Sequence, residues 1–157
     1  MTENIRSKVL IVDDVSANLK ILRDALEPEG YRILGASNGE DALRIATRAL
    51  PDIILLDILM PPGIDGYEVC RRLKQNKETS QTPVIFITVK EDMESLIEGF
   101  RAGGVDYITK PFYKEELLAR VETHLKISHL TQELLKKNRE LQAEMEKREQ
   151  AEKAQKQ

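Results

Sequence analysis

The sequence predicts an α/β domain built on a parallel sheet, and two observations carry this expectation. Five short apolar runs recur along the chain, and three of them are apolar almost throughout. Such runs are typical of strands covered by helices on both faces of a sheet. Segments with helical spacing of their apolar residues separate the runs. Strand and helix therefore alternate, which is the pattern of a parallel sheet with right-handed crossovers.

Each element has its own local signal. The predicted strands are Lys8–Val12, Tyr31–Ala36, Asp52–Leu56, Pro83–Thr88 and Val105–Thr109. The helices between them are marked by apolar residues three or four apart, at Leu19, Leu22 and Leu26; at Ala42, Leu43 and Ala46; at Tyr67, Cys70 and Leu73; and at Met93, Leu96, Ile97 and Phe100. Helix breakers end the first helix at Pro28 and Gly30, and the fourth at Gly103.

The C-terminal part predicts one long helix, because residues 112–157 contain neither Pro nor Gly. We expect a domain over residues 1–125 and a helical extension over 126–157. Six residues in the extension follow at spacings of 3, 4, 4, 3 and 4, namely Ile127, Leu130, Leu134, Asn138, Leu141 and Met145. This stripe favours a parallel two-stranded coiled coil and hence a homodimer, with Asn138 as a polar position that fixes register. The alternative is a single solvated helix.

Composition excludes several classes of protein. The net charge of −3 argues against direct binding of nucleic acid, which usually goes with a strong basic excess. Cys70 is the only cysteine, so no internal disulfide can form. No apolar run approaches the roughly 20 residues of a membrane span, and the first residues lack the apolar core of a signal peptide. We therefore expect a cytoplasmic protein that does not contact a membrane.

Acidic residues stand at the ends of two predicted strands. Asp13 and Asp14 follow the first strand, and Asp57 ends the third. If these strands are neighbours, three carboxylates meet in one crevice and would repel one another unless a hard cation such as Mg²⁺ binds them. The simpler alternatives are that Asp14 or Ser16 caps the following helix and that Asp57 is a turn residue.

Two further polar residues stand at the ends of the fourth and fifth predicted strands. Thr88 ends the fourth strand and Lys110 follows the fifth. A hydroxyl, an ammonium and three carboxylates at one edge of a sheet indicate a site for a phosphoryl group.

The motifs "VLIVDD", "DIILLDILMP", "DGYEVCRRLK", "PVIFIT" and "GVDYITKPF" together resemble the receiver domain of two-component response regulators. The resemblance covers the chain from about Lys8 to about Leu125. It implies a doubly wound, flavodoxin-like sheet of five parallel strands in the order 2-1-3-4-5. The C-terminal helix is similar to the helical connectors that lead from receiver domains to further domains.

The resemblance also assigns roles to the strand-end residues. Asp57 is implied to accept a phosphoryl group from a phosphohistidine on a histidine kinase or phosphotransfer protein. Asp14, Asp57 and the backbone carbonyl of Leu59 are implied to bind Mg²⁺, with Asp13 acting partly through water. Lys110 is implied to neutralise the phosphoryl oxygens, with a cis bond to Pro111. The alternative for that bond is a simple turn at the end of the strand.

Thr88 and Tyr107 are implied to form the switch that responds to phosphorylation. The added phosphoryl group brings about −1.5 to −2 charges and three acceptor oxygens, toward which Thr88 can turn its hydroxyl. Tyr107 can then move into the space that Thr88 leaves. The alternative for Tyr107 is an ordinary half-buried strand aromatic.

Two positions depart from the family pattern. Val89 follows Thr88 where Ala or Gly is usual, and we expect its branched side chain to crowd the approach to Asp57. The loop "MPPGIDG" is one residue longer than the usual "MPGMDG".

Other functions stay open beside the receiver interpretation. The chain could be a dimerisation or scaffold module with a vestigial pocket, or the N-terminal input part of a larger kinase, cyclase or phosphatase. A phosphohydrolase that uses a strand-end Asp needs a second acid two residues later, where this chain has Leu59. We therefore expect no enzymatic activity in this chain itself.

Overall fold

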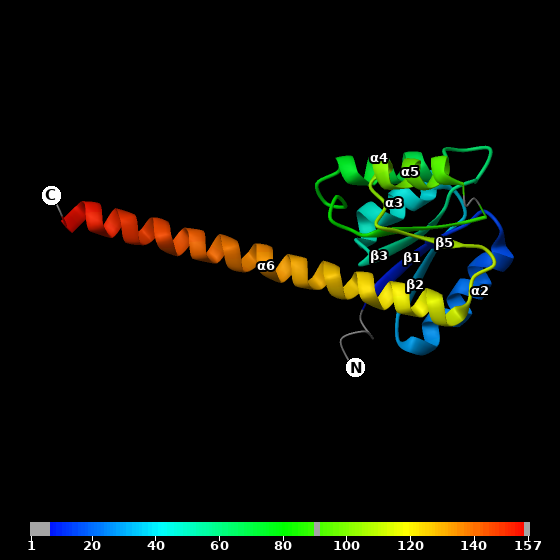
Figure 1. Ribbon diagram of the computed structural model, residues 1–157, viewed down its shortest axis with the longest axis horizontal. Coiled ribbons are helices and arrows are strands. Elements are labelled where there is room, and N and C mark those ends of the chain that lie inside the picture. The colour runs from blue at the N-terminus through cyan, green and yellow to red at the C-terminus, as the bar shows by residue number, and fades with distance from the viewer. Residues whose placement is uncertain (1–6, 90–91, 156–157) are drawn as a thin grey trace. The chain divides into compact units, whose positions relative to one another are not determined.

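The structure is a computed structural model that describes residues 7–89 and 92–155. Its five strands form one parallel sheet in the order β2-β1-β3-β4-β5, which confirms the predicted fold (Figure 1). The strands are β1 (Lys8–Val12), β2 (Arg32–Ala36), β3 (Ile53–Asp57), β4 (Val84–Thr88) and β5 (Asp106–Thr109).

Four strands begin one residue later than the sequence pattern indicates. Strand β2 begins at Arg32 instead of Tyr31, and β4 begins at Val84 instead of Pro83. Strands β3 and β5 begin at Ile53 and Asp106. Strand ends are defined only to within one or two residues, and Asp52 and Val105 still donate a backbone hydrogen bond to a neighbouring strand. Pro83 has no N–H to donate to a neighbouring strand. Strand β3 also extends to include Asp57, so the acid is the last residue of the strand itself.

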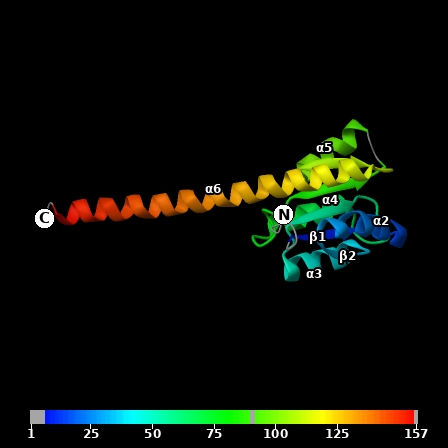
Figure 2. The ribbon, with the colours of Figure 1, turned by 90° about the horizontal axis from the view of Figure 1, so that it is seen from below.

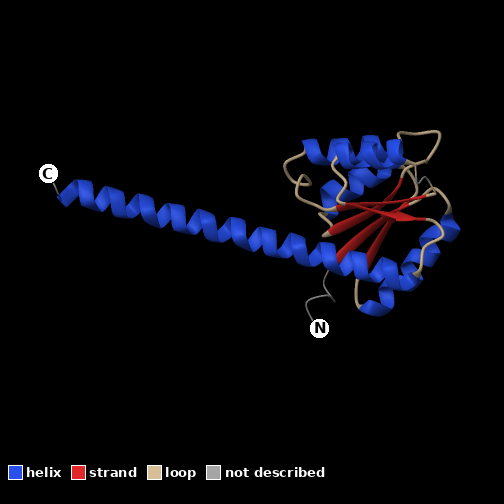
Figure 3. Cartoon of the chain, viewed as in Figure 1, coloured by secondary structure: helices blue, strands red, loops and turns tan. Residues whose placement is uncertain are grey.

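Helices cover both faces of the sheet, as Figures 1 and 3 show. Helices α3 (Gly39–Ala49), α4 (Gly66–Gln75) and α5 (Met93–Ala102) supply residues to the core on one face. Helix α2 (Ser16–Leu26), followed by the short 3₁₀ helix η1 (Glu27–Glu29), and the first turns of α6 (Lys114–Gln155) supply the core on the other. Each core therefore has the sheet as one wall.

The strands divide their side chains between the two cores. In β1, Leu10 and Val12 face the core of α3 and α4, whereas Val9 and Ile11 face that of α2 and α6. All four are essentially buried. Full burial of such a side chain contributes roughly 1.5–3 kcal/mol, and β3 and β4 repeat the pattern. The sheet is thus a tightly packed frame whose strand ends hold their positions.

Three helices begin with a side-chain cap, but α2 does not. The side chains of Asn38, Asp65 and Asp92 each accept a hydrogen bond from a backbone N–H in the first turn of α3, α4 and α5. The residue before α2 is Val15, and no side chain caps this helix. The alternative that Asp14 or Ser16 caps this helix is therefore wrong, and Asp14 remains available for another role.

Helix α6 runs unbroken from Lys114 to Gln155, and Figure 2 shows it as a single helix. The predicted end at Gln157 lies outside the described residues. Contacts divide the chain into two units, Met1–Leu125 and Lys126–Gln157. Within the described residues, no helix is long and apolar enough to cross a membrane.

Candidate functional site

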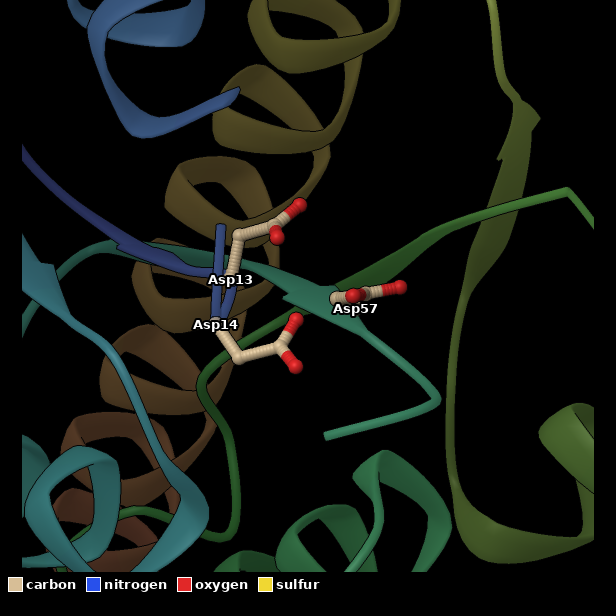
Figure 4. Close-up of side chains that lie close together, drawn as sticks. All are labelled: Asp13, Asp14 and Asp57. Atoms are coloured by element: carbon tan, nitrogen blue, oxygen red, sulfur yellow. The ribbon is translucent and has the colours of Figure 1, made fainter. Parts of the chain in front are cut away.

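The acidic residues meet at the carboxyl ends of β1 and β3. These strands are hydrogen-bonded neighbours, with Val12 paired to Leu56, so the residues that follow them emerge side by side. Asp13, Asp14 and Asp57 each place a carboxylate oxygen within 4.8 Å of the others (Figure 4). The prediction that three carboxylates share one crevice is confirmed.

Asp13 is buried, and its carboxylate accepts hydrogen bonds from three groups in different parts of the chain. One carboxylate oxygen accepts the backbone N–H of Val15 at 2.9 Å, which turns the chain into α2. The other accepts the side-chain amide of Asn18 at 3.2 Å and the ammonium of Lys110 at 2.8 Å. Lys110 comes from the far side of the sequence, 97 residues away. The charge of Asp13 is thus already balanced by protein groups.

Asp14 has the opposite environment. Its side chain is exposed, and it makes no hydrogen bond or ion pair with any residue in the ranges 7–89 and 92–155. A carboxylate in this position can bind a cation without losing a bond that it already makes. The contrast with Asp13 fits a direct metal ligand at Asp14 and an outer, positioning role at Asp13.

Asp57 is a buried carboxyl at the end of β3, with only 7% of its surface exposed. Burial and the nearby charge of Asp13 raise its pKa to about 6, although the ammonium of Lys110 and the N–H of Ile58 work in the other direction. Lys110 lies 3.5 Å from one carboxylate oxygen. A single ammonium shared between Asp13 and Asp57 leaves the crevice with excess negative charge, as a cation site requires.

Strands β4 and β5 end at the same edge of the parallel sheet as β3. Thr88 is the last residue of β4 and is buried, and its carbonyl accepts the backbone N–H of Lys110 at 2.8 Å. The bond between Lys110 and Pro111 is cis, as predicted. Tyr107 is half-buried, and it packs against the core of α3 and α4. That position is compatible both with a switch and with an ordinary strand aromatic.

Gly66, which the sequence analysis did not single out, lies against the backbone of Asp57 and Ile58. Its backbone N–H donates to the carbonyl of Ile58 at 2.8 Å, which closes the loop after Asp57. A Cβ atom at Gly66 would lie 2.3 Å from the carbonyl oxygen of Asp57, so only glycine fits. The signal that could have found it is a glycine directly after the capping residue Asp65.

The lengthened loop after Asp57 connects β3 to α4. It contains a second cis bond, between Pro61 and Pro62, and buries Met60 while Leu59 is 48% exposed. Val89, expected to crowd the approach to Asp57, is 65% exposed. Most of its side chain therefore lies in solvent, so the structure gives no support to crowding.

The residues present fit a magnesium ion. Their donors are carboxylate oxygens, which are the ligands that Mg²⁺ prefers, and one or two carboxylates with several waters complete its usual shell. Two of the three carboxyl groups are buried and excess negative charge remains after the ion pairs with Lys110. The carbonyl of Leu59 stays a predicted ligand.

Comparison with known proteins identifies the family. Residues 9–122 match the family described as Response regulator receiver domain. The chain belongs to this family. It is 39% identical over 119 residues to Protein PilH of Pseudomonas aeruginosa, which covers 76% of this chain and 98% of PilH. Receiver domains bind Mg²⁺ at an acidic pocket, and the cluster of Asp13, Asp14 and Asp57 corresponds to such a pocket.

Two further similarities define how far the relationship extends. The chain is 41% identical over 128 residues to Response regulator PleD of Caulobacter vibrioides, covering 82% of this chain but only 28% of PleD. The chain thus spans about a quarter of that relative. A putative response regulator from Chloroflexus aurantiacus has a crystal structure with a TM-score of 0.73 and 39% identity, covering 76% of this chain and 98% of the other. The matched domain therefore makes up nearly all of the Chloroflexus chain but only 28% of PleD.

Proposed function

We propose that this receiver domain accepts a phosphoryl group on Asp57, with Mg²⁺ bound by Asp14, Asp57 and the carbonyl of Leu59 and positioned by Asp13. The observation that carries the proposal is the meeting of three carboxylates within 4.8 Å, with the ammonium of Lys110 3.5 Å from Asp57. The donor is a phosphohistidine on a histidine kinase or phosphotransfer protein, the partners with which response regulators work.

The chain's own residues account for the transfer. A carboxylate oxygen of Asp57 attacks phosphorus, a P–O bond forms, and the P–N bond to the histidine breaks. Lys110 offsets charge on the phosphoryl oxygens, because its ammonium already faces Asp57. Bound Mg²⁺ supplies further compensation of that charge. The burial that raises the pKa of Asp57 also keeps water from competing for these interactions.

The switch needs more than one residue. A hydrogen bond from Thr88 to a charged phosphoryl oxygen contributes about 1.5–3 kcal/mol. Shifting an equilibrium from 1:99 to 99:1 requires about 5.5 kcal/mol. Thr88 therefore shares the switch with Lys110 and the metal, and Tyr107 follows by moving into the core against which it already packs.

The extension from Lys126 onward is the proposed output element. Its large exposed apolar residues are Ile127, Leu130, Leu134, Leu141 and Met145, which belong to the predicted stripe, and Leu135, which lies off it. An exposed apolar stripe on a helix favours pairing with a second copy, which gives a homodimer held by a coiled coil. Receiver domains are signalling modules, and any enzymatic output belongs to a partner or to a further domain, as in a kinase, cyclase or phosphatase.

Phosphorylation by a small donor tests the proposal. The protein is incubated with acetyl phosphate with and without Mg²⁺, and the modified residue is mapped by mass spectrometry. We expect modification of Asp57 only, dependent on Mg²⁺ and lost in Asp57→Asn. Asp52→Asn is the matched control, because Asp52 is exposed beside the opposite end of the same strand. An unmodified wild-type protein would instead favour a scaffold with a vestigial pocket.

A further inference from the structure

Two hydrogen bonds to the carboxylate of Asp13 end on the same oxygen. Its Oδ2 atom accepts the ammonium of Lys110 at 2.8 Å and the side-chain amide of Asn18 at 3.2 Å. Only 1% of the surface of Asp13 is exposed, so groups of the protein, and not bulk water, must satisfy this oxygen. Lys110 and Asn18 therefore act on one buried acceptor.

The first turn of α2 fixes the position of Asn18. Its backbone N–H donates to the carbonyl of Val15 at 3.0 Å, and the N–H of Val15 donates to the other carboxylate oxygen of Asp13 at 2.9 Å. The half-buried side chain of Asn18 then closes the ring by its own bond to Asp13. Because the acceptor is a carboxylate, the amide must present its N–H₂ group to it. An amide donates without adding charge, so the crevice keeps the excess negative charge that a cation requires.

Lys110, in contrast, lies between two acceptors. Its ammonium is 2.8 Å from Asp13 and 3.5 Å from Asp57. A phosphoryl group on Asp57 brings about −1.5 to −2 charges and three acceptor oxygens, which draw the ammonium away from Asp13. The buried oxygen of Asp13 then loses its charged donor. A buried acceptor left without a donor costs more than the bond itself was worth, and a charged acceptor costs the most.

We propose that Asn18 is a positioning residue that holds the carboxylate of Asp13 when Lys110 moves to a phosphoryl group on Asp57, and that it thereby favours the phosphorylated state. This inference rests on the proposed function and adds a residue of α2 to it. Asn18 acts through Asp13 and does not contact the reacting atoms. In the unoccupied site the ammonium of Lys110 and the N–H of Val15 already hold Asp13, so the contribution of Asn18 is small there.

Beryllofluoride binding to the full chain tests this role, because beryllofluoride mimics a phosphoryl group on Asp57 and needs no partner protein. It is titrated at saturating Mg²⁺, and the occupied site is quantified by fluorine NMR. We expect Asn18→Ala to weaken beryllofluoride binding about tenfold. Alanine leaves room for a water that replaces part of the lost bond. Asn18→Leu fills that room with an apolar group of similar size, so its loss should be at least as large.

Two measurements separate this role from a general effect on the fold. Without beryllofluoride, the Mg²⁺ affinity of Asn18→Ala should stay within about twofold of the wild type, and its urea midpoint should be nearly unchanged, because Lys110 still holds Asp13. In an Asp13→Asn background, Asn18→Ala should weaken beryllofluoride binding by less than about twofold, since the buried charge that it holds is gone.

Ser16→Ala is the matched control. Ser16 is exposed in the same first turn of α2, and its side chain makes no hydrogen bond with residues 7–89 or 92–155. This variant should bind beryllofluoride and Mg²⁺ like the wild type. It shows whether a change to alanine at the start of α2 is enough to alter the site.

The contrary outcomes are distinct. Wild-type beryllofluoride affinity in Asn18→Ala and Asn18→Leu would overturn the role of Asn18. So would equal losses of Mg²⁺ and beryllofluoride affinity, or an undiminished loss in the Asp13→Asn background, since either would mean that Asn18 does not act by holding the charge of Asp13 in the occupied site. A wild-type protein that fails to bind beryllofluoride at all would overturn the proposed function, and this inference with it.

Discussion

Asp57 carries its negative charge at a cost to stability, because burial and Asp13 raise its pKa from 3.8 to about 6. Below pH 3.8 both folded and unfolded chains hold the proton. Between that pH and about 6 the unfolded chain loses it first, so the free energy of unfolding falls as pH rises. Above about pH 6 the free energy of unfolding has fallen by the full amount that this carboxyl can contribute. After a discount for solvent screening, this decrease in the free energy of unfolding amounts to about 1–2 kcal/mol.

We therefore predict that Asp57→Asn stabilises the metal-free protein by about 1–2 kcal/mol at pH 7–8 and by almost nothing near pH 4. Urea unfolding in the presence of EDTA, followed by circular dichroism, measures the difference. Mg²⁺ should stabilise the wild type more than the variant, which narrows the gap. A difference that is independent of pH would show that the charge of Asp57 is not the cause.

The two adjacent acids at the end of β1 should differ in their contribution to metal binding. Asp14 is exposed and makes no competing bond among the described residues, whereas Asp13 is buried and bonded to Lys110. We predict that Asp14→Asn weakens Mg²⁺ binding about 100-fold or more, and Asp13→Asn about tenfold. Calorimetric titration of both variants measures this. Equal losses would contradict the direct and outer roles assigned to them.

At the scale of elements, the start of α4 depends on a close approach to β3. We predict that Gly66→Ala destabilises the protein by about 3 kcal/mol, because its Cβ would lie 2.3 Å from the carbonyl oxygen of Asp57 and 2.9 Å from the Cα of Ile58. Both are backbone atoms that cannot turn away. Metal binding should weaken as well, since Asp57 must move.

Gly35→Ala is the control for this prediction. A Cβ atom there meets only the flexible side chain of Arg23 at 3.6 Å, which is an ordinary contact. Thermal and urea unfolding of both variants should therefore separate them clearly. Similar stabilities for Gly66→Ala and the wild type would mean that α4 shifts readily, and that the loop after Asp57 is not fixed by this glycine.

At the scale of the whole molecule, we predict that the full chain is a dimer at tens of micromolar and that Leu134→Glu weakens the dimer at least about tenfold. Leu134 lies on the predicted coiled-coil stripe and is 62% exposed in the single chain. A charge at this position would be buried in the dimer. Light scattering and sedimentation over a range of concentrations measure the equilibrium.

Leu135→Glu is the matched control, since Leu135 is the next residue along but lies off the stripe. It should leave the dimer nearly unchanged. A monomeric wild-type chain at these concentrations would rule out the coiled coil, and equal effects of the two variants would show that another face of the helix pairs.

Much of this molecule was predictable from local patterns. Strand and helix periods gave the alternation and the long α6, because burial on a strand or helix repeats with a fixed period along the chain. Asp13, Asp14 and Asp57 could be expected to meet, because carboxyl ends of neighbouring parallel strands lie at one edge of the sheet. The order of the strands required the family resemblance as well.

The sequence by itself thus determined the elements, the edge of the sheet that bears the site and the kinds of side chain gathered there. Only the tertiary structure decided that Asp13 takes the ammonium of Lys110 while Asp14 stays exposed, and that Asp106 joins β5 to α6. The physical reason is range and direction. Periodicity records which face of an element is buried, whereas a hydrogen bond between residues 97 positions apart depends on where two separate backbones aim their side chains.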